Sequence, residues 1–343
     1  MSETKVPRHA ETAGGMPLGV YQRIAVGLLL AMSGATCGAP QAPTRELRLK
    51  VGNTERTSLL RLPAGRPTGE RVPLVINLHG GGGDAKGQVV TAAMERIADE
   101  KGFAVAYPQG LGRSLLGHTF GLWNAGKCCG RSALDGVDDV GFIATLIDRL
   151  VSESGIDRAR IYATGFSNGA MLSYRLACEL SDKIAAIAPV AGQGMFKECA
   201  PKRVVPTLHL HGTADPCAPY TGGDADGGCW RKITRMAPAM KILYEPVPEF
   251  FASWRKLHGV GGKPRTSYRN GAATCVAHGA GPAEMELCTS QGGGHAWPGG
   301  THGPICDKPG SRRCRKYVEI VGPLSNDVNA SRRMLDFFSR FRL

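Results

Sequence analysis

The sequence contains no apolar segment long enough to cross a membrane as a helix. Its apolar run from Ile24 to Met32 is too short for a transmembrane span. The chain has no internal repeat, and its 47 glycines follow no collagen-like period. Hydrophobic residues make up 42% and charged residues 21% of the 343 residues, as in ordinary globular proteins. The length allows one large domain with a sizeable core or two small ones.

Acidic residues are fewer than basic ones: the chain has 29 Asp and Glu but 42 Lys and Arg. The formal net charge is therefore +13. Such an excess can attract nucleic acid or another anionic polymer. No nucleic-acid-binding motif accompanies it, and the basic residues are spread along the chain apart from small clusters such as Arg312 to Lys316. We therefore expect a basic protein without a nucleic-acid partner.

The 11 cysteines include no Cys-x-x-Cys pair, and no histidine pair has the spacing of metal ligands, so we expect no metal site. Without Cys37, ten cysteines remain, and an even number in an exported chain suggests disulfides. Cys128 and Cys129 could bond to each other or belong to two separate bridges. Local pairs are expected between Cys217 and Cys229, Cys275 and Cys288, and Cys306 and Cys314.

Residues 1–39 have the features of an export signal and leader. Arg23 precedes the apolar core, and the small residues Ser33, Gly34 and Ala35 follow it. Cys37 could carry a lipid anchor, although its surroundings match a lipobox poorly. We expect a secreted or periplasmic protein whose catalytic domain occupies residues 40–343.

Apolar patterns in residues 40–343 predict strands that alternate with helices. Continuous apolar runs predict buried strands, and apolar spacing of three and four residues predicts helices. No boundary for a second domain is visible, although 219–245 resembles an insertion or lid-like loop. The alternation predicts an α/β fold with a mostly parallel sheet covered by helices on both faces. The expected helices are 89–101, 137–152, 168–180, 248–258 and 327–341, and the expected strands are two within 46–62 and then 74–78, 103–107, 160–163, 184–190, 207–210 and 285–289.

A Gly-x-Ser-x-Gly motif centred on Ser167 lies between an expected strand and an expected helix. This arrangement predicts a nucleophile elbow, a sharp turn that exposes the serine hydroxyl at the end of a sheet. Gly165 and Gly169 are needed because a Cβ at either position would clash in so tight a turn. The motif can also occur by chance in a glycine-rich chain, so a catalytic role for Ser167 requires a matching acid and histidine later in the sequence.

A serine hydroxyl needs a base to take its proton, and α/β-hydrolases supply the acid and then the histidine after the serine. Asp215 follows an expected strand, where the acid belongs, although it could also merely cap its own loop. His295 follows the last expected strand on a run of glycines, whereas His302, the nearest competitor, falls beyond a Pro-Gly-Gly turn. Asp138 and Asp139 precede the serine and open a helix, where acidic residues stabilise the helix start.

An oxyanion hole requires two backbone N–H donors. The first is expected from Asn168, directly after the nucleophile, and the second from the glycines after the strand that ends at Leu78. We assign it to Gly81, with Gly80 or Gly82 as alternatives. A phosphate-binding loop is disfavoured because no Lys-Ser or Lys-Thr follows the glycines.

Seven blocks of sequence together resemble the poly(3-hydroxybutyrate) depolymerase and feruloyl esterase family of secreted α/β-hydrolases. The resemblance runs from about Leu74 to the C-terminal helix. It implies an α/β-hydrolase fold and a serine esterase with the triad Ser167, Asp215 and His295. The blocks are Asn77–Gly83, Trp123–Gly126 with Cys128–Cys129, Val137–Ile143, Gly165–Met171, Ala188–Gly192, His211–Pro216 and Gly293–Gly299.

The resemblance implies cleavage of short hydroxyacyl polyesters, or of feruloyl and acetyl esters on plant polysaccharides. We expect a monomer that needs no cofactor and whose partner is a polyester oligomer or an esterified polysaccharide fragment. Trp297 could wall the acyl pocket or pack its own loop, and Trp123 could flank the cleft or belong to the core. Two rivals are a serine peptidase of the same fold and an inactive surface-binding hydrolase homologue.

Overall fold

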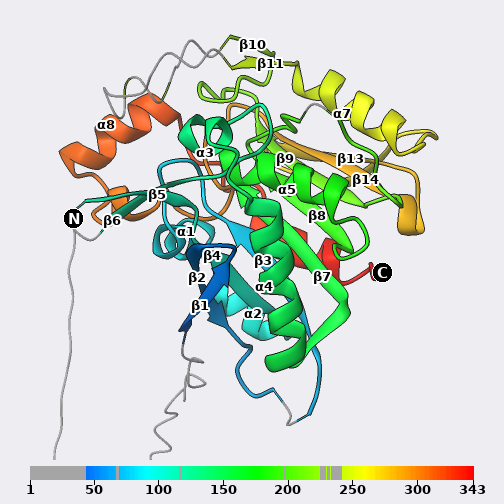
Figure 1. Ribbon diagram of the computed structural model, residues 1–343. Helices are drawn as coiled ribbons and strands as arrows, with labels where there is room; N and C mark the ends of the chain where they lie inside the picture. The colour runs from blue at the N-terminus through cyan, green and yellow to red at the C-terminus, as the bar shows by residue number, and fades with distance from the viewer. Residues whose placement is uncertain are drawn as a thin grey trace, which may run out of the picture. The chain divides into compact units, whose positions relative to one another are not determined.

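A ten-stranded sheet organises the protein, which we describe from a computed structural model that covers residues 44–66, 69–115, 118–196, 198–224, 229, 232 and 242–343 (Figure 1). The strand order is β1-β2-β4-β3-β7-β8-β9-β14-β13-β12. The middle of the sheet, from β4 to β14, is parallel, and antiparallel strands extend both edges. These strands are β1 Arg45–Val51, β2 Thr54–Arg61, β3 Val72–Leu78, β4 Ala104–Pro108, β7 Ile156–Phe166, β8 Ala186–Val190, β9 Thr207–Gly212, β12 Arg265–Asn270, β13 Ala273–His278 and β14 Met285–Ser290.

The central strands are buried on both faces because helices cover both sides of the sheet. Alternate residues of β3 belong to different cores: Leu74 and Ile76 pack into one, and Val75 packs into the other. The first core contains apolar residues of α4, α5 and α7, and the second contains those of α1, α2 and α9. The expected α/β architecture is therefore confirmed. The helices are α1 Ala85–Ala92, α2 Glu95–Lys101, α3 Gly130–Leu134, α4 Asp139–Glu153, α5 Asn168–Glu179, α7 Val247–Leu257, α8 Arg312–Val321 and α9 Ala330–Phe338.

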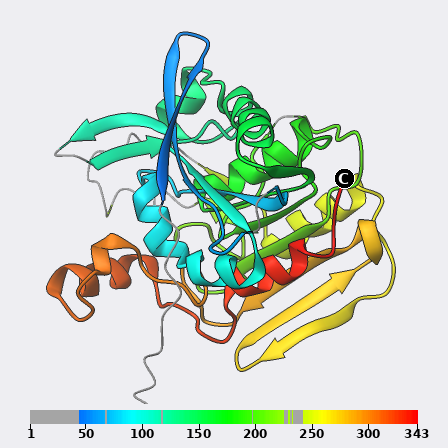
Figure 2. The same ribbon diagram turned by 90° about the horizontal axis from the view of Figure 1, so that it is seen from below.

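Some elements differ from the sequence prediction. The single helix expected over 89–101 is two helices, α1 and α2, because Ala93 adopts the left-handed conformation with φ 45° and ends the first. Strand β12 was not predicted, since it is largely exposed and polar, and β13 was not predicted either. The two strands form a hairpin at the sheet edge opposite β1 and β2 (Figure 2). A separate hairpin, β5 Leu111–Leu115 with β6 His118–Leu122, was also missed.

Five disulfides join the ten cysteines after Cys37. The three expected local pairs are all present, and Cys128 and Cys129 bond to each other. A fifth bridge links Cys178 at the end of α5 to Cys199. Residues 1–39, expected to be an export signal and leader, lie outside the described residues, and Cys37 is among them.

Residues Pro40–Leu343 form one compact unit. Within the expected insertion at 219–245, β10 Gly223–Asp224 pairs with β11 Leu243–Tyr244, and most residues between them lie outside the described part of the chain. Among the described helices, none is long and apolar enough to span a bilayer.

Candidate active site

Ser167 occupies the turn between β7 and α5, as the Gly-x-Ser-x-Gly motif predicts. Its backbone is in an unusual conformation, with φ 55° and ψ −116°. A Cβ on Gly165 would lie 2.5 Å from the carbonyl carbon of Gly169, and a Cβ on Gly169 would lie 2.4 Å from the Leu78 oxygen. Both glycines are therefore required by the close approach of the backbone. The Ser167 N–H donates to the Val190 oxygen at 2.9 Å, which ties the turn to β8.

Asp215 follows β9 and is almost completely buried. Its Oδ1 accepts hydrogen bonds from the backbone N–H groups of Cys217 and Ala218, both at 2.8 Å. Its Oδ2 accepts from Nδ1 of His295 at 2.8 Å. Burial alone would raise the pKa of the Asp215 carboxyl, but the charge of His295 and hydrogen bonds from His211 and His295 hold that pKa below its ordinary value. The carboxylate is therefore ionised and oriented toward His295.

His295 is carried by the glycine-rich loop after β14. The backbone N–H of His295 donates to the backbone oxygen of Val321 at 2.6 Å. A Cβ on the preceding Gly294 would lie 2.5 Å from that same oxygen. The loop thus packs too closely on the end of α8 for any larger residue. Because Nδ1 carries the proton that Asp215 accepts, Nε2 of the neutral ring is free to act as a base.

The ring of His295 lies against Phe166, the neighbour of Ser167, with ring centroids 4.7 Å apart. Among the described residues, no hydrogen bond joins Ser167 Oγ to the ring of His295. Such contacts are often long without substrate and tighten in the complex. The ring of His302 packs against Tyr317, with ring centroids 6.0 Å apart, whereas the ring of His295 is hydrogen-bonded to Asp215.

The loop after β3 supplies a free amide next to the elbow. The Gly82 N–H donates to the Gly121 oxygen at 2.7 Å, and the Gly83 N–H donates to the Gly80 oxygen at 3.0 Å. Within the described chain, the Gly81 N–H has no such partner. Asn168 is the first residue of α5, whose first-turn amides have no partner inside the helix. Gly81 and Asn168, the donors that the sequence assigned to an oxyanion hole, thus have no partner for their N–H groups among the residues that the structure describes, and neither does Gly80, the alternative that the sequence left open.

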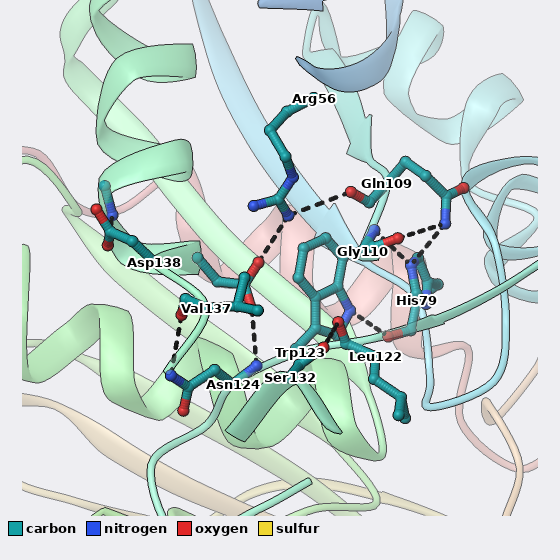
Figure 3. A network of polar contacts seen from close by, with 12 residues as sticks. Arg56, His79, Gln109, Gly110, Leu122, Trp123, Asn124, Ser132, Val137 and Asp138 are labelled. Carbon is teal, nitrogen blue, oxygen red and sulfur yellow. Dashed lines mark hydrogen bonds and ion pairs between the residues drawn. The ribbon is translucent and has the colours of Figure 1, made fainter. Parts of the chain in front are cut away.

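The ring of His79 is hydrogen-bonded both to this loop and to Gly110; Figure 3 shows it beside Gly110. Its Nδ1 donates to the Gly80 oxygen at 2.7 Å, and its Nε2 accepts from the Gly110 N–H at 2.9 Å. Burial lowers the pKa of His79 to about 4, so the ring is neutral at pH 7 and can donate and accept at once. The sequence analysis assigned no role to His79, because it precedes the serine. Its role in holding the loop follows from its bond to Gly110, which lies 31 residues away.

Trp123 connects the glycine loop after β3 to the start of α5. Its Nε1–H donates to the His79 oxygen at 2.9 Å (Figure 3). Its backbone N–H donates to Oδ1 of Asn168 at 2.8 Å, and its backbone oxygen accepts from Nδ2 of Asn168 at 3.1 Å. The glycine loop and the start of α5 are therefore bound to the same residue.

A buried ion pair supports the segment after Trp123. Arg56 on β2 donates to Oδ1 of Asp139 at 2.6 Å, and Oδ2 of Asp139 accepts from the Asn124 N–H at 2.7 Å. Burial raises the pKa of Asp139 even though Arg56 opposes that shift. Asp138 caps α4 by accepting from the Gly141 N–H, so neither residue competes with Asp215 for the role of triad acid.

The two tryptophans considered for substrate binding are completely buried. Neither side chain of Trp123 or Trp297 has measurable exposure, and Nε1 of Trp297 donates to Ser331 Oγ on α9 at 3.0 Å. This placement corresponds to the packing role that the sequence left open. Trp297 also belongs to the lining of a small cavity that contains Phe166 and His295.

Two groups of possible ligand atoms occur among the described residues. They are Asp215 with Cys217 and His295, and Cys275 with Glu286 and Cys288. All three cysteines are in disulfides, and a disulfide sulfur is not a thiolate ligand. The chemistry of these donor sets therefore does not suit a metal ion.

Comparison with known proteins places the chain among esterases. Residues 57–214 match the family model described as Esterase PHB depolymerase. Feruloyl esterase B of Piromyces equi is 30% identical over 70% of this chain and 42% of its own length. The protein named "Putative esterase NocK" of Nocardia uniformis subsp. tsuyamanensis is 29% identical over 83% of this chain and 92% of its own.

Among solved structures, an acetyl xylan esterase from Aspergillus awamori superposes with a TM-score of 0.51 at 15% identity. The match covers 74% of this chain and 94% of that one. At this identity the likeness concerns the fold alone. The chain spans about two fifths of the length of the Piromyces relative.

Proposed function

Because the chain belongs to the poly(3-hydroxybutyrate) depolymerase and feruloyl esterase family of α/β-hydrolases, we propose that it hydrolyses carboxylic esters with Ser167 as nucleophile. The observation that carries the proposal is the hydrogen bond between His295 Nδ1 and Asp215 Oδ2 beside the strained turn of Ser167. An imidazole oriented in this way leaves Nε2 available to take the serine proton.

In the proposed mechanism, Ser167 Oγ attacks the ester carbonyl while His295 takes its proton. The backbone amides of Gly81 and Asn168 donate to the oxyanion, whose stabilisation is usually the largest single contribution to such catalysis. His295 then gives the proton to the departing alcohol. Water, activated by the same histidine, releases the acid from the acyl-enzyme and regenerates Ser167.

We propose short hydroxyacyl esters as the substrate class, in line with the family model that matches residues 57–214. The second candidate is feruloyl or acetyl esters of plant polysaccharides, and the name of the Piromyces protein favours the feruloyl esters. The protein acts as a monomer outside the cytoplasm in this proposal. Five disulfides and the signal-like segment that contains Ile24 to Met32 support export.

The test compares Ser167→Ala with Ser173→Ala, which removes a buried hydroxyl six residues further along, within α5. With p-nitrophenyl acetate and butyrate, Ser167→Ala is expected to lose at least about 10³-fold in kcat, whereas Ser173→Ala keeps most of its activity. A fluorophosphonate probe is expected to label the wild type and not Ser167→Ala. Wild-type turnover in Ser167→Ala would refute the nucleophile.

A hydrolysis panel separates the substrate classes. Methyl ferulate, acetylated xylan and 3-hydroxybutyrate oligomers are compared by kcat/KM. A preference for the oligomers supports the first class, and a preference for either of the other two supports the second.

A further inference from the structure

Three buried side chains continue inward from the catalytic acid. His209 and His211 are two residues apart on β9, so their side chains lie on the same face of the strand. Tyr174 comes from α5, the helix that begins directly after Ser167. His209 and Tyr174 have no measurable exposure, and His211 is 2% exposed. None of the three contributes to the mechanism above.

The three side chains form one hydrogen-bonded row that ends at Asp215. Tyr174 Oη lies 2.8 Å from His209 Nδ1, and His209 Nε2 lies 3.0 Å from His211 Nδ1. His211 Nε2 lies 2.8 Å from the Ala218 oxygen and 3.4 Å from Asp215 Oδ2. The imidazoles are nearly parallel, with an interplanar angle of 18° and centroids 5.2 Å apart.

The position of every proton in this row follows from its last member. The Ala218 oxygen and the Asp215 carboxylate only accept hydrogen bonds, so Nε2 of His211 must carry a proton. When His211 carries this one proton only, its Nδ1 is an acceptor and requires the proton on Nε2 of His209. Nδ1 of His209 is in turn an acceptor and requires the Tyr174 hydroxyl as donor. All three donors therefore point toward Asp215.

The surroundings favour a neutral His209 and a protonated Tyr174 hydroxyl. Burial, with a smaller contribution from His211, holds the pKa of His209 well below its ordinary value. Burial raises the pKa of Tyr174, so its hydroxyl remains a donor. The rings that pack on the row are aromatic: Phe250 and Phe251 lie against His209, and Tyr220 lies against His211.

We propose that Tyr174, His209 and His211 are positioning residues that fix the tautomer of His211 and thereby the orientation of the Asp215 carboxylate. The inference rests on the proposed function, because it concerns the same triad. If the Tyr174 donor is lost, His209 can move its proton to Nδ1. Two ring nitrogens without protons then face each other, and His211 is driven to the tautomer whose lone pair faces Asp215. An ionised Asp215 is disfavoured next to that lone pair, so His295 loses its orientation.

The first test is Tyr174→Phe, which removes only the hydroxyl. The ring keeps its edge contacts with Phe250 and Trp254, at 5.1 and 4.8 Å. We expect kcat for p-nitrophenyl butyrate to fall roughly 5- to 30-fold with KM unchanged, because one hydrogen bond away from the substrate is lost. The matched control is Tyr162→Phe, which deletes a buried hydroxyl bonded to the Phe341 oxygen outside the row. It is expected to lower the melting temperature without changing kcat.

A proton NMR signal separates this role from a merely structural one. The proton that His295 Nδ1 shares with Asp215 is expected to resonate far downfield, and to shift or broaden in Tyr174→Phe but not in Tyr162→Phe. The signal needs no substrate and persists in Ser167→Ala. It therefore tests the row even if the protein hydrolyses none of the esters, a result that would count against the proposed function alone.

A second pair of variants covers the case in which Tyr174→Phe does not fold. His209→Gln retains an N–H donor for His211, whereas His209→Leu retains none. We expect His209→Gln to keep a larger kcat and the downfield signal, and His209→Leu to lose both. Equal kcat and equal signals in the two variants, or in the two tyrosine variants, would overturn the proposal.

Discussion

On the oxyanion side of Ser167, the Gly80–Gly83 loop is held by backbone groups and by the neutral ring of His79, whereas on the acid side Asp215 lies against the row of buried side chains that begins at Tyr174. The first arrangement leaves backbone N–H groups of the loop without partners within the described chain. The second fixes which proton sits on which nitrogen. Stabilising a new charge thus depends on backbone shape here, while preparing a base depends on side-chain tautomers.

The largest expected effect is on the acid side. Asp215→Asn places an amide next to Nδ1 of His295 and favours the wrong tautomer, so kcat is expected to fall about 10³- to 10⁴-fold. The measurement is steady-state hydrolysis of p-nitrophenyl butyrate. Asp138→Asn is the control, because asparagine caps a helix as well as aspartate does. A comparable loss in Asp138→Asn would mean that the acid had been misassigned.

The next effect belongs to the oxyanion side. Gly81→Pro deletes one backbone donor, and kcat is expected to drop about 10²- to 10³-fold. Gly81→Ala keeps the N–H and serves as the matched variant. The ratio of kcat in Gly81→Ala to kcat in Gly81→Pro measures how much the Gly81 N–H contributes to catalysis. If both variants retain the same activity, the second donor lies elsewhere in the loop.

Two tryptophans distinguish catalytic support from ordinary packing. Trp123→Phe removes the donor to the His79 oxygen, and Trp297→Phe removes the donor to Ser331 Oγ. Each is expected to lower the free energy of unfolding by about 1 kcal/mol, as measured by urea denaturation. Only Trp123→Phe is expected to reduce kcat, by roughly 10-fold. Trp123 is the tryptophan that is hydrogen-bonded to His79, the residue directly before the Gly80–Gly83 loop. Equal kcat values in Trp123→Phe and Trp297→Phe would show that Trp123 has a packing role only.

The smallest effect is a pH dependence of stability that comes from His79. Its pKa is about 4 in the folded protein and about 6.5 in the unfolded chain, so the unfolded state binds the extra proton between these values. Its contribution is complete above pH 6.5 and declines as the pH falls toward 4. It amounts to about 1 kcal/mol between pH 7.5 and 5.5.

His79→Gln is expected to flatten this part of the unfolding curve, measured by urea titration at several pH values. The exposed His118 provides the control, because His118→Gln should leave the slope unchanged. An unchanged slope in His79→Gln would show that other groups set the acid sensitivity.

The parts of the site that sequence predicts are those determined by neighbouring residues. Gly165 and Gly169 are needed by the same turn that holds Ser167, so the motif carries its own geometry. The order of Ser167, Asp215 and His295 follows from parallel strands that end at one edge of the sheet. Continuous apolar runs likewise indicated most of the central strands.

The rest depends on contacts between distant segments. The role of His79 requires Gly110, and that of His211 requires Tyr174 through His209, pairings that no local pattern encodes. The break between α1 and α2 depends on one residue, Ala93, in an uncommon backbone conformation. Strand β12 carries mostly exposed polar residues and exists because it pairs with β13.

The short ladder between β10 and β11 has a consequence for how this catalytic domain can vary. Gly223 and Asp224 pair with Tyr244 and Leu243, so the chain leaves and returns at one place close after the acid. The cost of closing a loop grows slowly with its length, by only about 0.6 kcal/mol for each doubling. Residues can therefore be inserted or removed between Cys229 and Leu243 while the ladder and the disulfide from Cys229 to Cys217, the neighbour that bonds Asp215, stay intact. The domain can acquire a new surface there while the triad keeps its geometry.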